Sequence, residues 1–322
     1  MNIVVTGSIA FDYLMNFPGD FLEHIKPERL QKLSLSFLVD EMVKQYGGCA
    51  PNIAFSLALL GERPVVMATA GQDFDSYRDW LQSHGVDTSA IKVIPGLFTA
   101  SFFCNTDAGQ NQIASFYTGA MAHARDLSFA DLADAVDLTI ISANDPDAME
   151  RYAEECRRVG IHFIYDPSQQ VVRSTPESLA KSVVGADILI VNDYEYELLK
   201  DRTGMDDDAI RSAVKRAVIV TLGADGVAIW ADGEETRVPA LTVDQIVDPT
   251  GVGDAFRAGL MKGLALGLPW QACGRMGNVA AAFVLETRGP QTHSYSLAEY
   301  IDRYVAAFGE DEATSALRAE IA

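Results

Sequence analysis

Short apolar runs alternate with amphipathic helical patterns along most of this chain. The helical patterns between the runs include Ala148–Arg158 and Pro176–Val183. Because strands that are joined by helices run parallel, this alternation predicts an α/β fold, with a mainly parallel sheet and helices on both of its faces. Ligands of such sheets bind beyond the carboxyl ends of the strands. The predicted strands are Ile3–Gly7, Val65–Ala70, Leu138–Ser142, His162–Asp166, Ile188–Asn192 and Val218–Gly223.

A β-hairpin is predicted where this alternation is interrupted. Residues 99–106 and 110–118 are strand-like and flank the turn sequence Asp-Ala-Gly that ends at Gly109. Phe102 and Phe116 each lie seven residues from Gly109. If the hairpin is symmetric about that glycine, the two rings lie opposite each other on one face.

A second interruption is Lys32–Asp40, whose period-two alternation predicts a half-exposed strand. This strand and the hairpin have no helix partners, so we expect them to form a small separate sheet, a lid over the ligand crevice. After Val247 the pattern is mostly helical. We expect residues 1–322 to form one domain, with a lid made by approximately residues 13–46 and 97–122.

Composition excludes several classes of function. The chain has 322 residues and a formal net charge of −20, which argues against a nucleic-acid partner, because such binding requires a basic surface. A few backbone N–H groups still suffice to hold a small anion. The four cysteines are far apart and form no C-x-x-C pair, so no disulfide framework or structural zinc site is expected. Without a basic leader or a membrane-length apolar stretch, we expect a cytoplasmic protein with no membrane partner.

The segment Asp248–Phe256 (D-P-T-G-V-G-D-A-F) carries the strongest chemical signal. Its glycines and proline end any preceding element, and a helix pattern begins after them. Backbone N–H groups from Gly251 to Asp254 therefore lie at a helix N-terminus, where an anion can bind. Asp254 would point at that anion and accept a hydroxyl proton, as phosphoryl transfer requires. We expect the helix end to keep Asp254 ionised. The alternative is an ordinary acidic helix cap.

Asn192 and Glu195 follow a predicted buried strand and lie about one helical turn apart. Such an amide and carboxylate can hold the water shell of Mg²⁺ beside ATP phosphates. The alternative is a capping box, with Asn192 as N-cap and Glu195 reaching back, and spacing alone favours it.

A glycine-containing segment joins two predicted strands and would let the backbone approach a nucleotide phosphate. The alternative is a simple turn, since a G-x-x-G pattern is weak. The segment consists of Thr221, Leu222, Gly223, Ala224, Asp225 and Gly226.

Residues near the N-terminus suit a sugar. Asp12 follows the first strand, and Asn52 lies at the start of a predicted helix that ends at Leu60. Their acceptors and amide match neighbouring sugar hydroxyls, and Gly48 would let the backbone touch the ligand. The alternatives are a solvated loop acid for Asp12 and first-turn capping for Asn52.

Candidate residues for contacting a planar nucleobase lie on the predicted lid and after the strand that ends near Asp166. Phe102 and Phe116 on a thin lid are candidates for stacking, although rings on strands are more often core. Gln169 and Gln170 follow the strand that ends near Asp166 and would bond a base edge; the alternative is a polar loop. Neither a P-loop nor a G-x-G-x-x-G after a strand is present.

Together these motifs resemble the ribokinase-like sugar and nucleoside kinases. The resemblance rests on Asp248–Asp254, on Gly47-Gly48 before Asn52, on Asn192-x-x-Glu195 and on Thr221-x-Gly223-x-x-Gly226, in that family's order. Further segments carry a closer resemblance, which are Val5–Ala10, Leu35–Asp40, Ile113–Tyr117, Gly119–Met121, Asp166–Gln170 and Asp248–Arg257. In these segments the chain resembles bacterial adenosine kinases of the mycobacterial type, and the resemblance extends from Met1 to about Phe308. It implies a Rossmann-like body with a β-sheet lid, the use of ATP and Mg²⁺, a monovalent cation such as K⁺, and a homodimer paired through the lids.

The resemblance also implies roles for individual positions. Asp254 would be the base, with Gly251 and Gly253 in the anion hole and Gly253 also against ATP. The ribose would be held by Asp12, Gly48 and Asn52. The base would be surrounded by Ser8, Ser36, Gln169 and Gln170, and stacked on Phe102 and Phe116. ATP and its magnesium would be served by Asn192, Glu195 and Thr221, Leu222, Gly223, Ala224, Asp225 and Gly226.

We therefore expect a kinase that moves the γ-phosphoryl group of ATP to the 5′-hydroxyl of a purine ribonucleoside, with adenosine, converted to AMP, as the favoured substrate. The first alternative is a sugar kinase of the same family for ribose or fructose. The second is a non-catalytic nucleoside sensor, which would not need Asp254, Asn192 and Glu195 together.

Overall fold

The fold is built on a large, mostly parallel sheet. The structure is a computed structural model that describes residues 1–25, 35–132 and 135–321. Within them, nine strands form one sheet in the order β13-β12-β11-β10-β9-β8-β1-β4-β5. Neighbours from β11 to β5 are parallel, whereas β12 is antiparallel to both β11 and β13. The strands are β1 (Ile3–Thr6), β4 (Val65–Ala70), β5 (Ile91–Val93), β8 (Leu138–Ile141), β9 (His162–Tyr165), β10 (Ile188–Asn192), β11 (Ala217–Thr221), β12 (Val227–Ala231) and β13 (Glu234–Val238).

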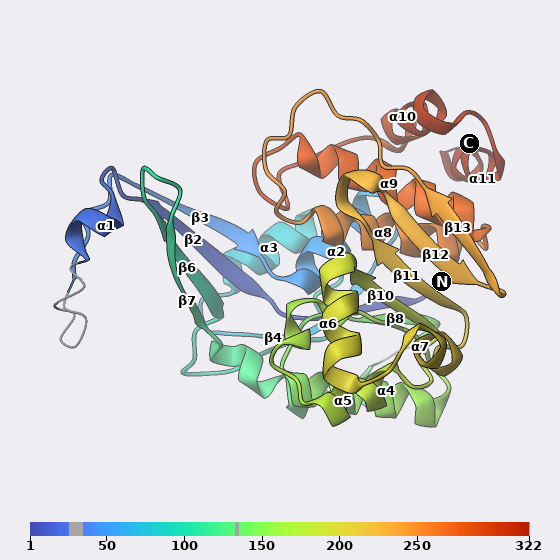
Figure 1. The fold of residues 1–322 in the computed structure, drawn as a ribbon, viewed down its shortest axis with the longest axis horizontal. Helices are drawn as coiled ribbons and strands as arrows, with labels where there is room; N and C mark the ends of the chain where they lie inside the picture. Colours follow the sequence, from blue (N-terminus) through green and yellow to red (C-terminus); the bar gives the residue numbers. More distant parts are fainter. Residues whose placement is uncertain (26–34, 133–134, 322) are drawn as a thin grey trace.

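Helices cover both faces of this sheet (Figure 1). One face packs on α2 (Cys49–Leu59), α3 (Asp75–Ser83) and α8 (Val252–Ala265). The other packs on α4 (Pro146–Val159), α5 (Pro176–Val183), α6 (Asp193–Thr203) and α7 (Asp207–Ala213). The other α-helices of the described residues are α1 (Phe21–His24), α9 (Trp270–Leu285), α10 (Leu297–Phe308) and α11 (Glu312–Ile321).

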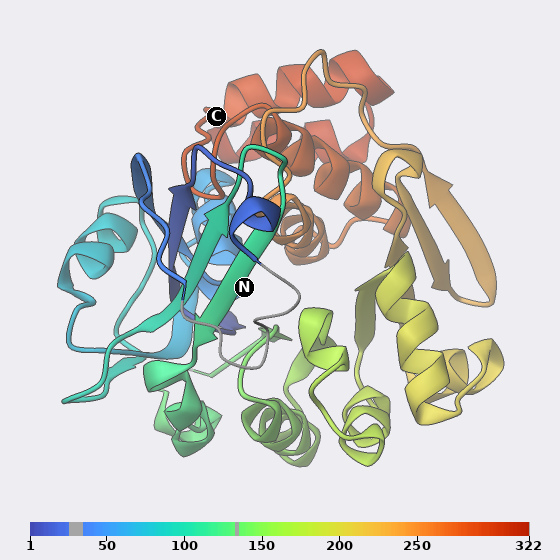
Figure 2. The ribbon, with the colours of Figure 1, turned by 60° about the vertical axis from the view of Figure 1, so that its left-hand side comes forward.

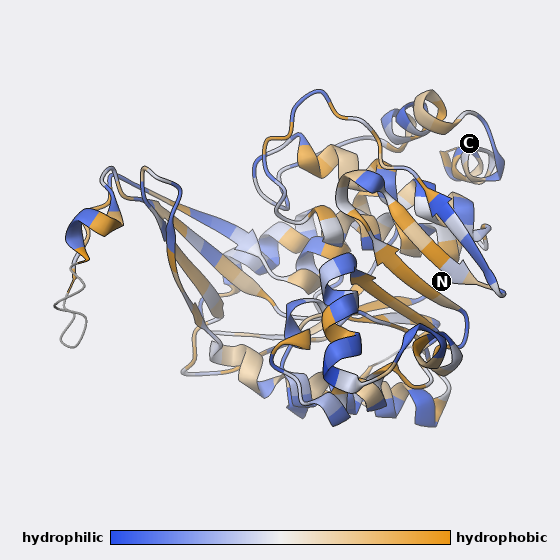
Figure 3. Ribbon diagram, viewed as in Figure 1, coloured by the Kyte–Doolittle hydropathy of each residue, from blue (hydrophilic) through white to orange (hydrophobic). Residues whose placement is uncertain are grey.

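The central strands are apolar on both faces because both are covered. Along β1, Val5 contributes to the core on the α2 and α8 side, while its neighbour Val4 contributes to the core on the opposite side. Figure 3 shows the same pattern, with hydrophobic strands inside and mixed helices outside. In the described part of the chain, no helix is both long and apolar enough to cross a membrane.

A separate sheet forms the lid and projects from the body (Figures 1 and 2). Its strand order is β3-β2-β6-β7. The strands are β2 (Ala10–Asn16), β3 (Glu41–Gly47), β6 (Ala100–Thr106) and β7 (Gln112–Tyr117). Phe102 pairs with Phe116 across the hairpin, as predicted. Phe102 also pairs with Asp12 on β2, so all three side chains lie on one face of the lid.

The structure confirms the α/β fold, the predicted strands to within two residues at each end, and the separate lid sheet. The prediction of a strand at Lys32–Asp40 is wrong for the part of this segment that the structure describes. Residues 35–39 have no regular structure, and β3 begins at Glu41. Residues 32–34 lie outside the described residues. The physical reason is an aromatic cluster, because Phe37 packs on Phe17 and Phe21 at the far end of the lid.

Candidate functional site

A cavity of about 990 Å³ lies between the lid, the carboxyl ends of the sheet strands and the start of α8. This is the upper end of the usual range for small-molecule sites, roughly 300–1,000 Å³. The predicted site residues that line it are Ser8, Asp12, Gly48, Asn52, Phe102, Phe116, Gln169, Gln170, Asn192, Glu195, Thr221, Gly223, Gly226, Gly251, Gly253 and Asp254. Those outside the lining are Ser36, which is exposed, and Leu222, Ala224 and Asp225.

The start of α8 presents unpaired backbone donors to the cavity. In the described residues, the amides of Gly253 and Asp254 have no backbone acceptor. Gly251 has a φ of +82°, and a Cβ there would lie 2.4 Å from Pro290 Cβ, so this turn requires glycine. The Asp248 carboxylate holds the turn by accepting from the amides of Thr250 and Gly289, both at 2.9 Å. An anion is therefore favoured at this helix end.

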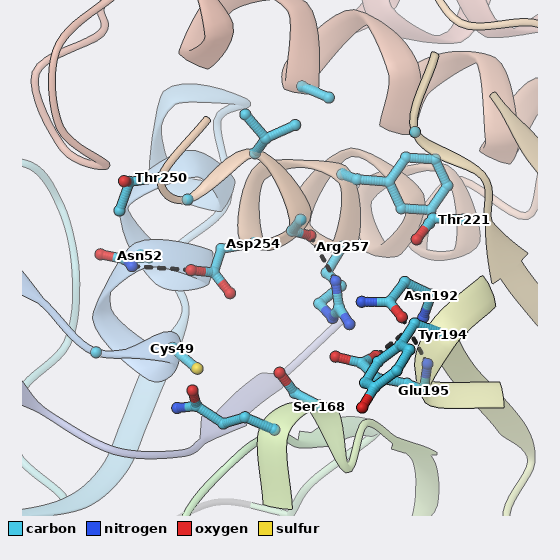
Figure 4. Close-up of a pocket in the computed structure, with 18 of the residues that line it drawn as sticks. Cys49, Asn52, Ser168, Asn192, Tyr194, Glu195, Thr221, Thr250, Asp254 and Arg257 are labelled. Atoms are coloured by element: carbon cyan, nitrogen blue, oxygen red, sulfur yellow. Dashed lines mark hydrogen bonds between the residues drawn. The ribbon is translucent and has the colours of Figure 1, made fainter. Parts of the chain in front are cut away.

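Asp254 lies beside these donors and is held by one amide. Asn52 Nδ2, from α2, donates to Asp254 Oδ2 at 2.8 Å (Figure 4). Burial raises the pKa of Asp254 to about 7, although the nearby Arg257 and the Asn52 hydrogen bond act in the opposite direction. Burial therefore opposes the expected effect of the helix end, and a pKa of about 7 leaves this carboxyl mostly ionised only above neutral pH. A carboxylate with a pKa near neutrality is suited to general-base catalysis.

A buried ion pair, absent from the sequence-based prediction, fixes the first turns of α8. Arg257 Nε and Nη2 donate to the two oxygens of Asp166, each at 2.6 Å, and Arg257 Nη1 donates to the Gly253 carbonyl at 2.9 Å. Ser142 Oγ donates to Asp166 at 2.9 Å. The pair therefore ties α8 to the ends of β8 and β9. An arginine three residues after Asp254, among the apolar residues that follow it in α8, was the available signal.

Asn192 and Glu195 form the capping box that spacing alone favoured. Asn192 Oδ1 accepts from the Glu195 amide at 2.7 Å, and Glu195 Oε2 accepts from the Asn192 amide at 2.9 Å. Burial raises the pKa of Glu195. Both residues also line the cavity, so the capping role and a ligand role are compatible. A single carboxylate forms no complete cation cage, and this fits Mg²⁺ that keeps most of its waters and binds substrate phosphates.

The lid contributes the Asp12 carboxyl group and the rings of Phe102 and Phe116 to the cavity lining. Asp12 lies on β2 rather than in a solvated loop, and burial raises its pKa to about 6. Gly47 leaves room for it, since a Cβ there would lie 2.4 Å from Asp12 Oδ2. At Gly48, with a φ of +95°, a Cβ would lie 2.4 Å from the Ser8 carbonyl oxygen. This tight turn brings α2 against the end of β1.

The two base-side glutamines differ in burial, because Gln169 is exposed, as in a polar loop, whereas Gln170 is buried. Gln170 is 4% exposed, and its Oε1 has no hydrogen-bond partner in the described residues. A buried, unpaired amide oxygen is costly, so a ligand donor at this position would be stabilising. Sequence reasoning also missed several polar or sulfur-containing residues of the lining, among them Cys49, Arg173, Tyr194 and Asn278.

Comparisons with known proteins agree with this architecture. The family model described as pfkB family carbohydrate kinase matches residues 7–296. A nucleoside kinase of Methanothermobacter thermautotrophicus is 28% identical over 311 residues, which are 96% of this chain and 97% of the relative. A nucleoside kinase of Burkholderia thailandensis, solved in complex with inosine, superposes with a TM-score of 0.85 at 36% identity, covering 96% of this chain and 98% of the other.

An adenosine kinase of Sinorhizobium meliloti has a TM-score of 0.70 at 22% identity, with 90% of this chain and 95% of the other covered. This likeness extends to the fold alone. The family match covers most of the chain, including the lid, the strand ends and the α8 helix that together line the cavity. The chain therefore belongs to the ribokinase-like pfkB family of carbohydrate kinases.

Proposed function

We propose that this protein transfers the γ-phosphoryl group of ATP to the 5′-hydroxyl of a purine ribonucleoside, with adenosine as a substrate. The observation that carries the proposal is the position of Asp254. Its carboxylate lies beside the unpaired amides of α8, in a cavity that Asp12 and the ring pair Phe102 and Phe116 also line. Two curated relatives that match more than 90% of this chain are nucleoside kinases, and the nucleoside kinase of Burkholderia thailandensis was solved with inosine.

Each part of the cavity has a defined task in this reaction. The ring pair stacks on the base, and Asp12 accepts hydrogen bonds from sugar hydroxyls. Asp254 accepts the proton of the 5′-hydroxyl while that oxygen bonds to the γ-phosphorus. The bond from phosphorus to the β,γ-bridging oxygen breaks, and ADP leaves. The amides of Gly253 and Asp254 donate to the oxygens of the transferring group, whose charge they stabilise.

The ATP side is assigned to Asn192, Glu195 and the turn from Thr221 to Gly226. Glu195, with Asn192, would hold the waters of Mg²⁺, which neutralises charge on the ATP phosphates when it is bound. The capping box keeps both side chains in place at the start of α6.

A substrate panel tests the proposal against a sugar kinase and a sensor. Adenosine, inosine, guanosine, ribose and fructose are each incubated with ATP, and ADP release is scored. We expect turnover with purine nucleosides, adenosine included. Equal or better use of ribose or fructose would establish the sugar kinase instead, and nucleoside binding without ADP release would establish the sensor.

Phe116→Ala is expected to weaken adenosine affinity by about 1–3 kcal/mol, because one stacking surface for the base is lost. Titration calorimetry measures the affinity directly. The matched control is Phe98→Ala, since Phe98 is an exposed ring outside the cavity lining. An unchanged affinity in Phe116→Ala would show that the base binds elsewhere.

The opposite face of the lid supports a homodimer. It carries exposed apolar side chains, which are Met42, Phe103, Ile113 and Tyr117. We propose that a second copy of this chain covers this face. Light scattering is expected to give a mass near twice that of the chain, and a lower mass for Met42→Asp. A wild-type monomer would contradict the pairing.

A further inference from the structure

A chain of hydrogen bonds lies directly behind the Asn52 amide that holds Asp254. Asn52 Oδ1 accepts from Gln291 Nε2 at 2.8 Å, and Gln291 Oε1 accepts from Trp80 Nε1 at 3.2 Å. Gln291 Nε2 also donates to Tyr77 Oη, whose O–H donates to the Gly47 carbonyl at 2.9 Å. Asn52, Gln291 and Tyr77 are 5%, 3% and 0% exposed. The bonds therefore lie in a region of low water access, where their directions matter.

The groups at the two ends of this hydrogen-bond network fix the direction of its bonds. The indole N–H of Trp80 is only a donor, and the Gly47 carbonyl is only an acceptor. The Trp80 N–H therefore requires the oxygen of the Gln291 amide on its side, which turns the Gln291 nitrogen towards Asn52. That nitrogen in turn requires the Asn52 oxygen, which leaves the Asn52 nitrogen facing Asp254. With either amide reversed, two donors or two acceptors would meet in a buried site, at a cost of about 1–3 kcal/mol.

We propose that Gln291, oriented by Trp80, is a positioning residue that keeps the N–H side of the Asn52 amide on Asp254. The inference rests on the proposed function, in which Asp254 is the base. Asn52 occupies Oδ2 of that carboxylate, so the other oxygen is left for the substrate hydroxyl. A reversed Asn52 would instead place its carbonyl oxygen against the carboxylate and disfavour the ionised base.

The plain alternative is that these groups form a structural network joining α2, α3 and the segment after α9. The two roles differ in what they do to the titration of Asp254. Its hydrogen bond from Asn52 lowers its pKa, against the larger effect of burial. The other charged or titratable groups facing it are Arg257 on α8, Asp166 after β9, Asp12 on β2, Cys49 on α2 and Tyr77 on α3. A change at Trp80 leaves all of these side chains in place.

The test is Trp80→Phe, which removes the N–H but keeps a ring against Phe55, its stacking neighbour at 6.2 Å between centroids. For the wild type, kcat/KM for adenosine is expected to fall as pH drops below about 7, because Asp254 becomes protonated. In Trp80→Phe we expect the midpoint of this acid limb, the pH range over which kcat/KM falls, to rise by about one pH unit. At a fixed pH below the midpoint, kcat/KM is then about tenfold lower than in the wild type. At pH well above the limb, kcat should approach that of the wild type.

Gln291→Met provides a second, uncharged variant that removes the link itself, and it should shift the limb in the same direction. Gln82→Met, on the same helix as Trp80, is the control, because Gln82 donates its hydrogen bond to Thr88 and takes no part in the network around Asn52. If the pH dependence is unshifted in both Trp80→Phe and Gln291→Met while Asp254→Asn shows its expected loss of kcat, the positioning role alone is overturned. Full activity of Asp254→Asn would overturn the proposed base first.

Discussion

Asp254→Asn is expected to lower kcat by about 10²-fold or more while nucleoside binding stays nearly intact. Asparagine keeps the size of the side chain and still accepts the Asn52 hydrogen bond on its oxygen. It removes the group that takes the proton from the 5′-hydroxyl. The unpaired amides at the start of α8 remain, so the residual activity reports electrostatic stabilisation of the phosphoryl group without the base.

Steady-state kinetics with adenosine and ATP, together with calorimetric binding of adenosine, separate the two effects. Asp75→Asn is the control, because it removes an exposed carboxylate from the first turn of α3, outside the cavity lining. Turnover close to that of the wild type in Asp254→Asn would mean that another group is the base. A loss of binding equal to the loss of kcat would mean that Asp254 holds the substrate rather than reacting with it.

The sequence was sufficient for features that depend on local pattern. The apolar run at Ile188–Asn192 predicts a strand because it is short, β-branched and followed by a capping pair, and β10 has these bounds. The pairing of Phe102 with Phe116 was predictable because a hairpin sets its register within a few residues of its turn. The loop-to-helix pattern around Gly251 likewise predicted where α8 begins, to within three residues.

What the sequence could not supply depends on contacts between distant segments. Arg257 and Asp166 are 91 residues apart, and Gln291 and Asn52 are 239 apart, so no spacing rule joins them. The raised pKa of Asp254 follows from how many elements close around it, which local charge at a helix end does not reveal. Strand β2 was missed because Ala10–Asn16 follows β1 after three residues, without a helix or a turn signal between them.

Arg257→Met is expected to lower the free energy of unfolding by about 3–5 kcal/mol, because it leaves the buried Asp166 carboxylate without its partner. The side chains of Arg257 and Asp166 are only 8% and 1% exposed, so water does not replace the lost hydrogen bonds. The same change frees the Gly253 carbonyl, and we expect kcat to fall with the loosening of the first turn of α8.

Urea unfolding of wild type and variants measures the effect, with Arg318→Met as the matched control. Arg318 pairs with Glu310 through two hydrogen bonds, but both side chains are about half exposed, and a surface pair contributes about 0–1 kcal/mol. The double variant Arg257→Met with Asp166→Leu should recover much of the stability, since removing both charges leaves nothing unpaired. It should not recover kcat, because the tie from β9 to α8 that orients Asp254 is still missing. Equal stability losses in Arg257→Met and Arg318→Met would show that the buried pair does not hold the helix.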